Sequence, residues 1–73
     1  MKIIKNYTTS SAFTFLGELS QEEVENKIED FGSDEDLINA ELNKEYPQDK
    51  YFVLVDYIDD RNMGYFHIRI WKK

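Results

Sequence analysis

Apolar and polar positions alternate most regularly in the C-terminal third of the chain. The runs 51–58 and 65–71 are rich in β-branched and aromatic residues, and segment 59–64 between them is rich in turn formers. This pattern predicts an antiparallel hairpin.

The register of this hairpin follows from keeping one of its faces apolar. The pairs predicted on the core face are Tyr57–Phe66, Val55–Ile68 and Val53–Ile70. A slip of one residue would place the Asp56 carboxylate among these buried side chains, so the apolar register is favoured. On the second face the same register predicts the pairs Asp56–His67, Leu54–Arg69, Phe52–Trp71 and Ile58–Tyr65.

Two helices are predicted in the middle of the chain, where the apolar period changes. Ser20 and Glu23 have the spacing of a capping box, and Gly32 suits the helix end. The apolar stripe of this helix is Val24, Ile28 and Phe31. Ser33 is the candidate N-cap of the second helix, and Pro47 ends it. Its stripe is Ile38, Leu42 and Tyr46, and the alternative of one kinked helix is left open.

Residues 2–16 are prone to β structure, and a cluster of hydroxyl residues interrupts them. Two short strands are favoured over one bent strand. The predicted fold is a single α+β domain over residues 1–73. It is a two-layer sandwich in which an antiparallel sheet of three or four strands carries one or two helices on one face, in the order (β)β-α-α-β-β.

Composition limits the kind of protein. With 73 residues and no cysteine, the eleven aromatic residues must supply much of the core. The N-terminus does not resemble a signal peptide, and no apolar run approaches the roughly 20 residues that span a bilayer. We therefore expect a soluble, cytoplasmic protein.

Charge is distributed unevenly along the chain. The formal net charge is −6, but the fifteen acids all lie between residues 18 and 60, where three lysines leave a charge of −12. Direct binding to nucleic acid or to anionic lipid is disfavoured, because both reward positive charge.

The sequence offers little catalytic equipment. His67 is the lone histidine, and neither a cysteine nor a Gly-x-Ser-x-Gly motif accompanies it, so we interpret its pairing with Asp56 as a cross-strand ion pair. The acids of segment 30–41 have spacings like those of a calcium loop. However, the loop's third position is Gly32 and its sixth is Glu35, where an oxygen ligand and a glycine are required. We therefore predict no catalytic residue, no metal and no cofactor.

Two surfaces could bind a partner. In size, charge and lack of catalytic residues, the chain resembles in general character the small acidic inhibitor proteins of phages and other mobile elements, including nucleic-acid mimics and anti-CRISPR proteins. The leading hypothesis is accordingly a non-enzymatic inhibitor that occupies a basic, nucleic-acid-binding surface of a larger protein. The candidate residues are Glu22, Glu25, Glu29, Asp30, Asp34, Glu35, Asp36, Asp59 and Asp60.

The alternative hypothesis uses the second face of the hairpin. That face is too apolar to be left exposed to water, so either the rest of the chain covers it or a partner does. In the second case the protein is a small regulatory or structural module that docks or forms a homodimer. The candidate residues are Phe52, Leu54, Tyr65, Arg69 and Trp71.

Overall fold

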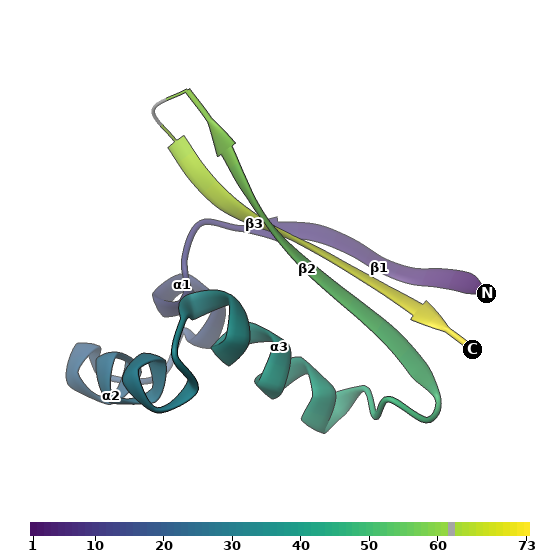
Figure 1. Ribbon diagram of the computed structural model, residues 1–73, viewed down its shortest axis with the longest axis horizontal. Helices are drawn as coiled ribbons and strands as arrows, with labels where there is room; N and C mark the ends of the chain where they lie inside the picture. The colour runs from purple at the N-terminus through teal and green to yellow at the C-terminus, as the bar shows by residue number, and fades with distance from the viewer. Residues whose placement is uncertain (62) are drawn as a thin grey trace.

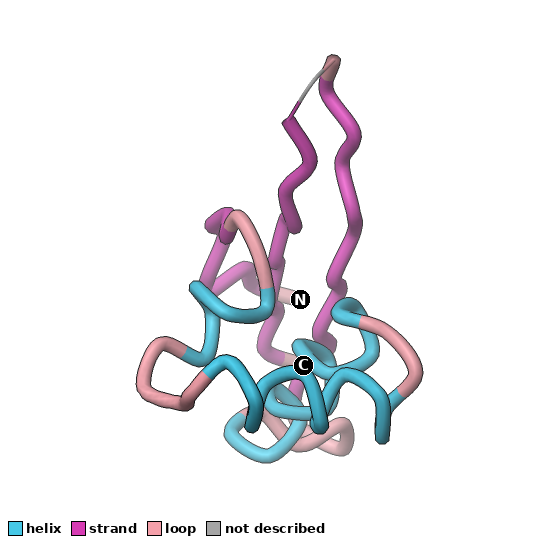
Figure 2. Tube along the Cα trace, turned by 90° about the vertical axis from the view of Figure 1, so that its left-hand side faces the viewer, coloured by secondary structure: helices cyan, strands magenta, loops and turns pink. Residues whose placement is uncertain are grey.

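The computed structural model describes residues 1–61 and 63–73, and within them it confirms a small α+β fold. The elements in chain order are β1 (Lys2–Thr9), α1 (Ala12–Leu16), α2 (Gln21–Phe31), α3 (Asp34–Glu45), β2 (Tyr51–Asp60) and β3 (Met63–Lys72). The strands form an antiparallel sheet in the order β1-β3-β2. The helices lie together on one side of this sheet (Figure 1), and the hairpin of β2 and β3 extends beyond them (Figure 2).

The hairpin has the predicted register. Tyr57 faces Phe66, Val55 faces Ile68, and every other pair predicted on both faces is present. The strands are longer than predicted, since β2 continues to Asp60 and β3 begins at Met63. Asn62 of the predicted turn lies outside the described residues.

The prediction of two N-terminal strands is wrong. Residues 2–9 form one strand, which pairs with β3 and carries a bulge between Ile3 and Lys5. The next residues form α1, because the Ser11 hydroxyl accepts the Thr14 N–H at 3.1 Å and so caps a helix start. Gly17, with a φ of 69°, ends this short helix.

The two predicted helices form as separate elements. Ser20 caps α2 by accepting the Glu23 N–H at 3.2 Å, and Ser33 caps α3 by accepting the Asp36 N–H at 3.1 Å. Between them, Gly32 takes a left-handed φ of 96°, which a residue with a Cβ adopts only at a cost. The helices therefore break at Gly32 and do not form one kinked rod.

The core lies between the helices and one face of the sheet. Helix α3 packs on β2, whereas α2 packs on α3 and α1. The buried hydrophobic residues are Ala12, Val24, Leu37, Ile38, Leu42, Tyr46, Val55, Phe66, Ile68 and Ile70. The sequence pattern places Phe31 in the α2 stripe, but it is 42% exposed, because α2 packs mainly on α3 and α1 and not on the sheet.

Candidate binding surfaces

The predicted acidic residues of the helices lie on one continuous part of the chain. We call the carboxylates of α2 and of the first turn of α3 the acidic helical surface. Its members are Glu22, Glu23, Glu25, Glu29, Asp30, Asp34, Glu35 and Asp36. All of them are exposed except Asp34, which is half-buried. Eight carboxylates are thus held on two helices that meet at Gly32.

Asp59 and Asp60 do not join this surface. They end strand β2 at the tip of the hairpin, where Arg61 follows them. The hairpin tip lies at the top of the view in Figure 1, whereas α2 lies at the bottom. The sequence-predicted acidic site is therefore divided into a helical part and a separate tip.

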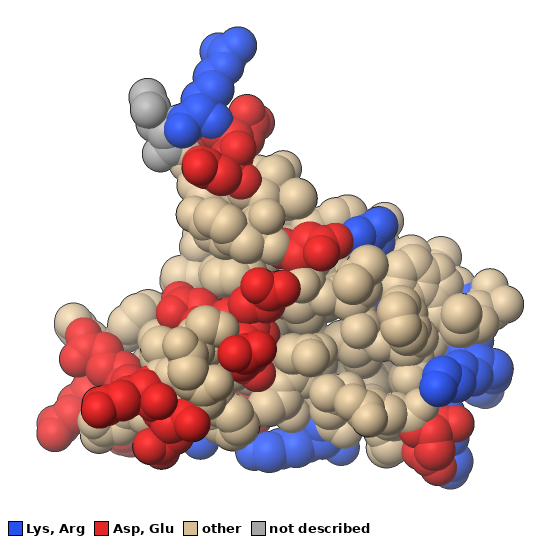
Figure 3. All heavy atoms as spheres, in the orientation of Figure 1, with Lys and Arg blue, Asp and Glu red and all other residues tan. Residues whose placement is uncertain are grey.

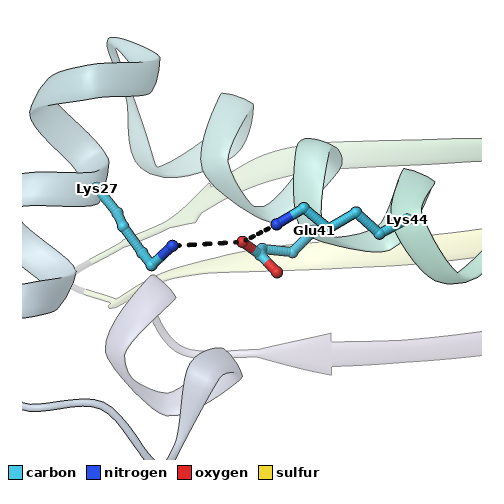
Figure 4. Close-up of polar contacts among 3 residues, drawn as sticks. All are labelled: Lys27, Glu41 and Lys44. Carbon is cyan, nitrogen blue, oxygen red and sulfur yellow. Dashed lines mark hydrogen bonds and ion pairs between the residues drawn. The ribbon is translucent and has the colours of Figure 1, made fainter.

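Lys27 is the one basic residue among residues 20–36, and its ion-pair partner belongs to α3 and not to its own helix. Its Nζ lies 3.8 Å from the Glu41 Oε1 of α3, and the Lys44 Nζ reaches the same oxygen at 3.1 Å (Figure 4). Glu41 therefore engages the cation that could have neutralised part of α2. Among the described residues, no carboxylate of the acidic helical surface has a cationic group within 4.0 Å.

Positive charge gathers elsewhere. Lys2 faces Lys72 where β1 and β3 begin and end, and Lys73 follows. The two chain ends lie far from α2 along the long dimension of the molecule (Figure 1). On the visible face, red atoms predominate at the left-hand end, whereas the right-hand end shows blue atoms with red atoms beside them (Figure 3). Negative charge is therefore concentrated at one end of the molecule, and both signs are mixed at the other.

The second candidate surface is the sheet face that points away from the helices. We call it the outer sheet face. It consists of Ile3, Asn6 and Thr8 of β1, Phe52, Leu54, Asp56 and Ile58 of β2, and Tyr65, His67, Arg69 and Trp71 of β3. The buried residues of the strands all belong to the opposite face, and no residue of the outer sheet face is buried. Among the described residues, no element of the chain covers this face.

The polar contacts on the outer sheet face differ from those predicted. Asp56 stands opposite His67, but its carboxylate accepts a hydrogen bond from the Arg69 Nη2 at 2.5 Å. His67 instead hydrogen-bonds through Nε2 to the Oδ1 of Asn6 at 2.5 Å. The predicted Asp56–His67 ion pair is thus wrong, because a guanidinium one position along the face competes for the carboxylate and β1 offers the imidazole another partner.

Aromatic side chains lie next to these polar side chains on the outer sheet face. The Phe52 and Trp71 rings lie 5.5 Å apart between centroids, and the Arg69 guanidinium lies 5.8 Å from the centre of the Trp71 ring. Such contacts hold flat apolar groups in a fixed arrangement on the strands. Phe52 remains 44% exposed.

Strand β1 contributes residues to this surface that were not among the predicted sites. Ile3 faces Trp71 and Asn6 faces Arg69. Their positions follow from the pairing of residues 2–9 with the last strand, and the sequence pattern alone does not determine that pairing.

On the core side of β1, two groups have shifted pKa values. Partial burial raises the pKa of the Tyr7 phenol above its usual value. The pKa of the Lys5 ammonium is also raised, first through its interaction with the Tyr46 side chain. The Lys5 Nζ lies 5.8 Å from the centre of the Tyr46 ring.

Hollows in the part of the chain that the structure describes are open to solvent. A shallow hollow of about 240 Å³ lies between α3 and β2, and Asn39, Asn43 and Tyr51 contribute to its lining. Within residues 1–61 and 63–73, no three His, Cys, Asp or Glu side chains are grouped so that they could hold a metal ion. None of the helices in these residues has the length and apolar character needed to cross a membrane.

Comparisons of the chain with protein-family models, with curated proteins and with solved structures found no match.

Proposed function

We propose that this chain is a non-enzymatic binding protein whose acidic helical surface occupies a basic, nucleic-acid-binding surface of a larger protein, in the manner of a phage-type inhibitor. The observation that carries the proposal is the engagement of Lys27 by Glu41. Because of it, Lys27 does not form an ion pair with the carboxylates of its own helix.

The helices give these carboxylates a defined spacing. Residues three and four positions apart follow one another along a helix face, and Glu22, Glu25 and Glu29 have such spacings on α2. A row of fixed negative charges can meet the lysine and arginine side chains that ordinarily contact phosphates. The partner would then have to release this protein before it could bind nucleic acid.

The experiment uses capture from a cell lysate with two matched variants. In the first variant, Glu25, Glu29 and Asp30 become lysine, which also suits the negative C-terminal end of the α2 macrodipole. In the control variant, Glu18, Glu45 and Asp49 become lysine, so the net charge changes equally at exposed positions outside the acidic helical surface. Proteins captured at low salt are eluted with short duplex DNA or with heparin.

The proposal predicts that the parent and the control capture the same protein and that polyanions or high salt release it. The α2 variant should lose that protein while keeping its helical circular dichroism. Equal loss of the captured protein in both triple variants would show that net charge alone, and not the acidic helical surface, determines binding, which would contradict the proposal. A captured protein that polyanions do not release would also contradict it. A further variant with Asp59 and Asp60 reversed tests the hairpin tip separately.

A further inference from the structure

The outer sheet face remains without a function in this proposal. It carries six large apolar side chains, and the described part of the chain does not cover it. These residues are Ile3, Phe52, Leu54, Ile58, Tyr65 and Trp71. We infer that a second copy of this chain covers the outer sheet face, so that two sheets pack face to face in a symmetric dimer.

Charge favours a second copy at this face and opposes it elsewhere. On the outer sheet face, Asp56 and Arg69 form an ion pair with each other, so the acid and the base of this face offset one another. The chain has a net charge of −6, and most of its acids lie on the helices, on the other side of the sheet. Face-to-face packing leaves the two acidic helical surfaces on the outsides of the dimer, where their mutual repulsion is smallest.

The sheet has two edge strands, β1 and β2, and the β1 edge is less suited to the same task. Strand β1 carries Lys2 and Lys5 and a bulge between Ile3 and Lys5. Lysines and bulges on edge strands oppose pairing with another chain. A second copy is therefore expected on the face and not at the β1 edge.

The area of the face sets the strength of the dimer. Three strands of eight to ten residues span roughly 400 Å² when strands lie about 4.8 Å apart and rise about 3.3 Å per residue. Two such faces bury roughly 800 Å² of flat surface, which is below the roughly 1,200 Å² of stable specific interfaces and fits only a weak, transient association. We expect a reversible dimer with a dissociation constant on the order of 100 µM.

The test combines sedimentation with the fluorescence of Trp71, which is the one tryptophan of the chain and lies on the outer sheet face. Between about 1 and 500 µM, the mass should rise from 8.7 kDa toward twice that value. Over the same range, acrylamide should quench Trp71 less efficiently. Both changes should share one midpoint.

Two variants at positions of similar exposure distinguish association through the outer sheet face from nonspecific hydrophobic association. Phe52→Lys, at a position 44% exposed on the outer sheet face, should weaken association at least about tenfold, whereas Phe31→Lys, at a position 42% exposed on α2, should leave it unchanged. Phe52→Thr keeps the strand propensity and serves if the lysine variant does not fold. A protein that stays monomeric throughout, a dimer without Trp71 protection, or equal weakening by the Phe31 variant would overturn the inference. These results are independent of lysate capture by the acidic helical surface.

Discussion

Asp56 accepts a hydrogen bond from Arg69, two residues along β3 from His67, which Asp56 faces directly. The pair lies at the centre of the outer sheet face and is partly exposed. The Arg69 guanidinium is in turn near the Trp71 ring. The strand register thus decides which side chains are neighbours, and the reach of the guanidinium decides which of them bond.

This relationship predicts which positions are energetically coupled. A double-mutant cycle of Asp56→Ala and Arg69→Ala should give a coupling of about 0.3–1 kcal/mol in the free energy of unfolding. The cycle of Asp56→Ala and His67→Ala should be additive within about 0.3 kcal/mol at both pH 5.5 and pH 8. Urea titrations measure both, and a His67 coupling that grows at low pH would show that the carboxylate prefers the imidazole.

The start of α2 depends on its cap. Ser20→Ala removes the acceptor for the Glu23 N–H and should destabilise the protein by about 1 kcal/mol. Ser20→Asp keeps an acceptor there and should restore most of that loss. If thermal melts of the alanine variant and the parent coincide, the cap does not stabilise the helix.

Gly64 leaves room for an aromatic pair near the hairpin tip. A Cβ at Gly64 would overlap the Tyr57 hydroxyl and ring, and the Tyr57 ring packs against the Phe66 ring at a tilt, with 5.2 Å between ring centroids. Gly64→Ala should force Tyr57 aside and cost about 0.5–1.5 kcal/mol through the lost pair. In a Tyr57→Ala background the same substitution should cost nothing, and an equal cost in both backgrounds would contradict this arrangement.

Alkaline pH should weaken the fold through β1. Because burial raises the pKa of Tyr7, the folded state holds this phenolic proton more tightly than the unfolded state does. The corresponding stability is complete below the unfolded pKa and is lost as the pH rises through the folded pKa. The difference in absorbance between the parent and Tyr7→Phe isolates the phenolate of Tyr7. This phenolate should form at higher pH in the native protein than in urea, and formation at lower pH in the native protein would contradict the raised pKa.

Much of the fold could be predicted from local patterns. The alternation of Phe66, Ile68 and Ile70 determined the hairpin register, because only one register keeps the core face apolar. The cap at Ser20 was equally clear, since its acceptor and the Glu23 N–H lie within one turn. Such features depend on neighbours that are close in sequence.

The features that could not be predicted depend on distant packing or on competition between similar signals. The segment 12–16 has strand-forming residues, but the cap at Ser11 and the core position of Ala12 favour a helix. The exposure of Phe31 depends on α2 packing against α3 instead of the sheet. The carboxylates of α2 form a group that is visible in the sequence. The ion pair of Lys27 with Glu41, in contrast, depends on how α2 packs against α3.

The salt dependence of the association rate tests the acidic helical surface most directly. Stopped-flow mixing with the captured partner in solution, or a surface-binding assay with the partner immobilised, measures the association rate. Each compares the parent with the variant in which Glu25, Glu29 and Asp30 become lysine. The parent's association rate should fall at least about tenfold between 50 and 500 mM salt, and the variant at low salt should associate as slowly as the parent at high salt. Equal, salt-independent rates for both proteins, together with loss of binding in Trp71→Ala, would contradict the proposed function.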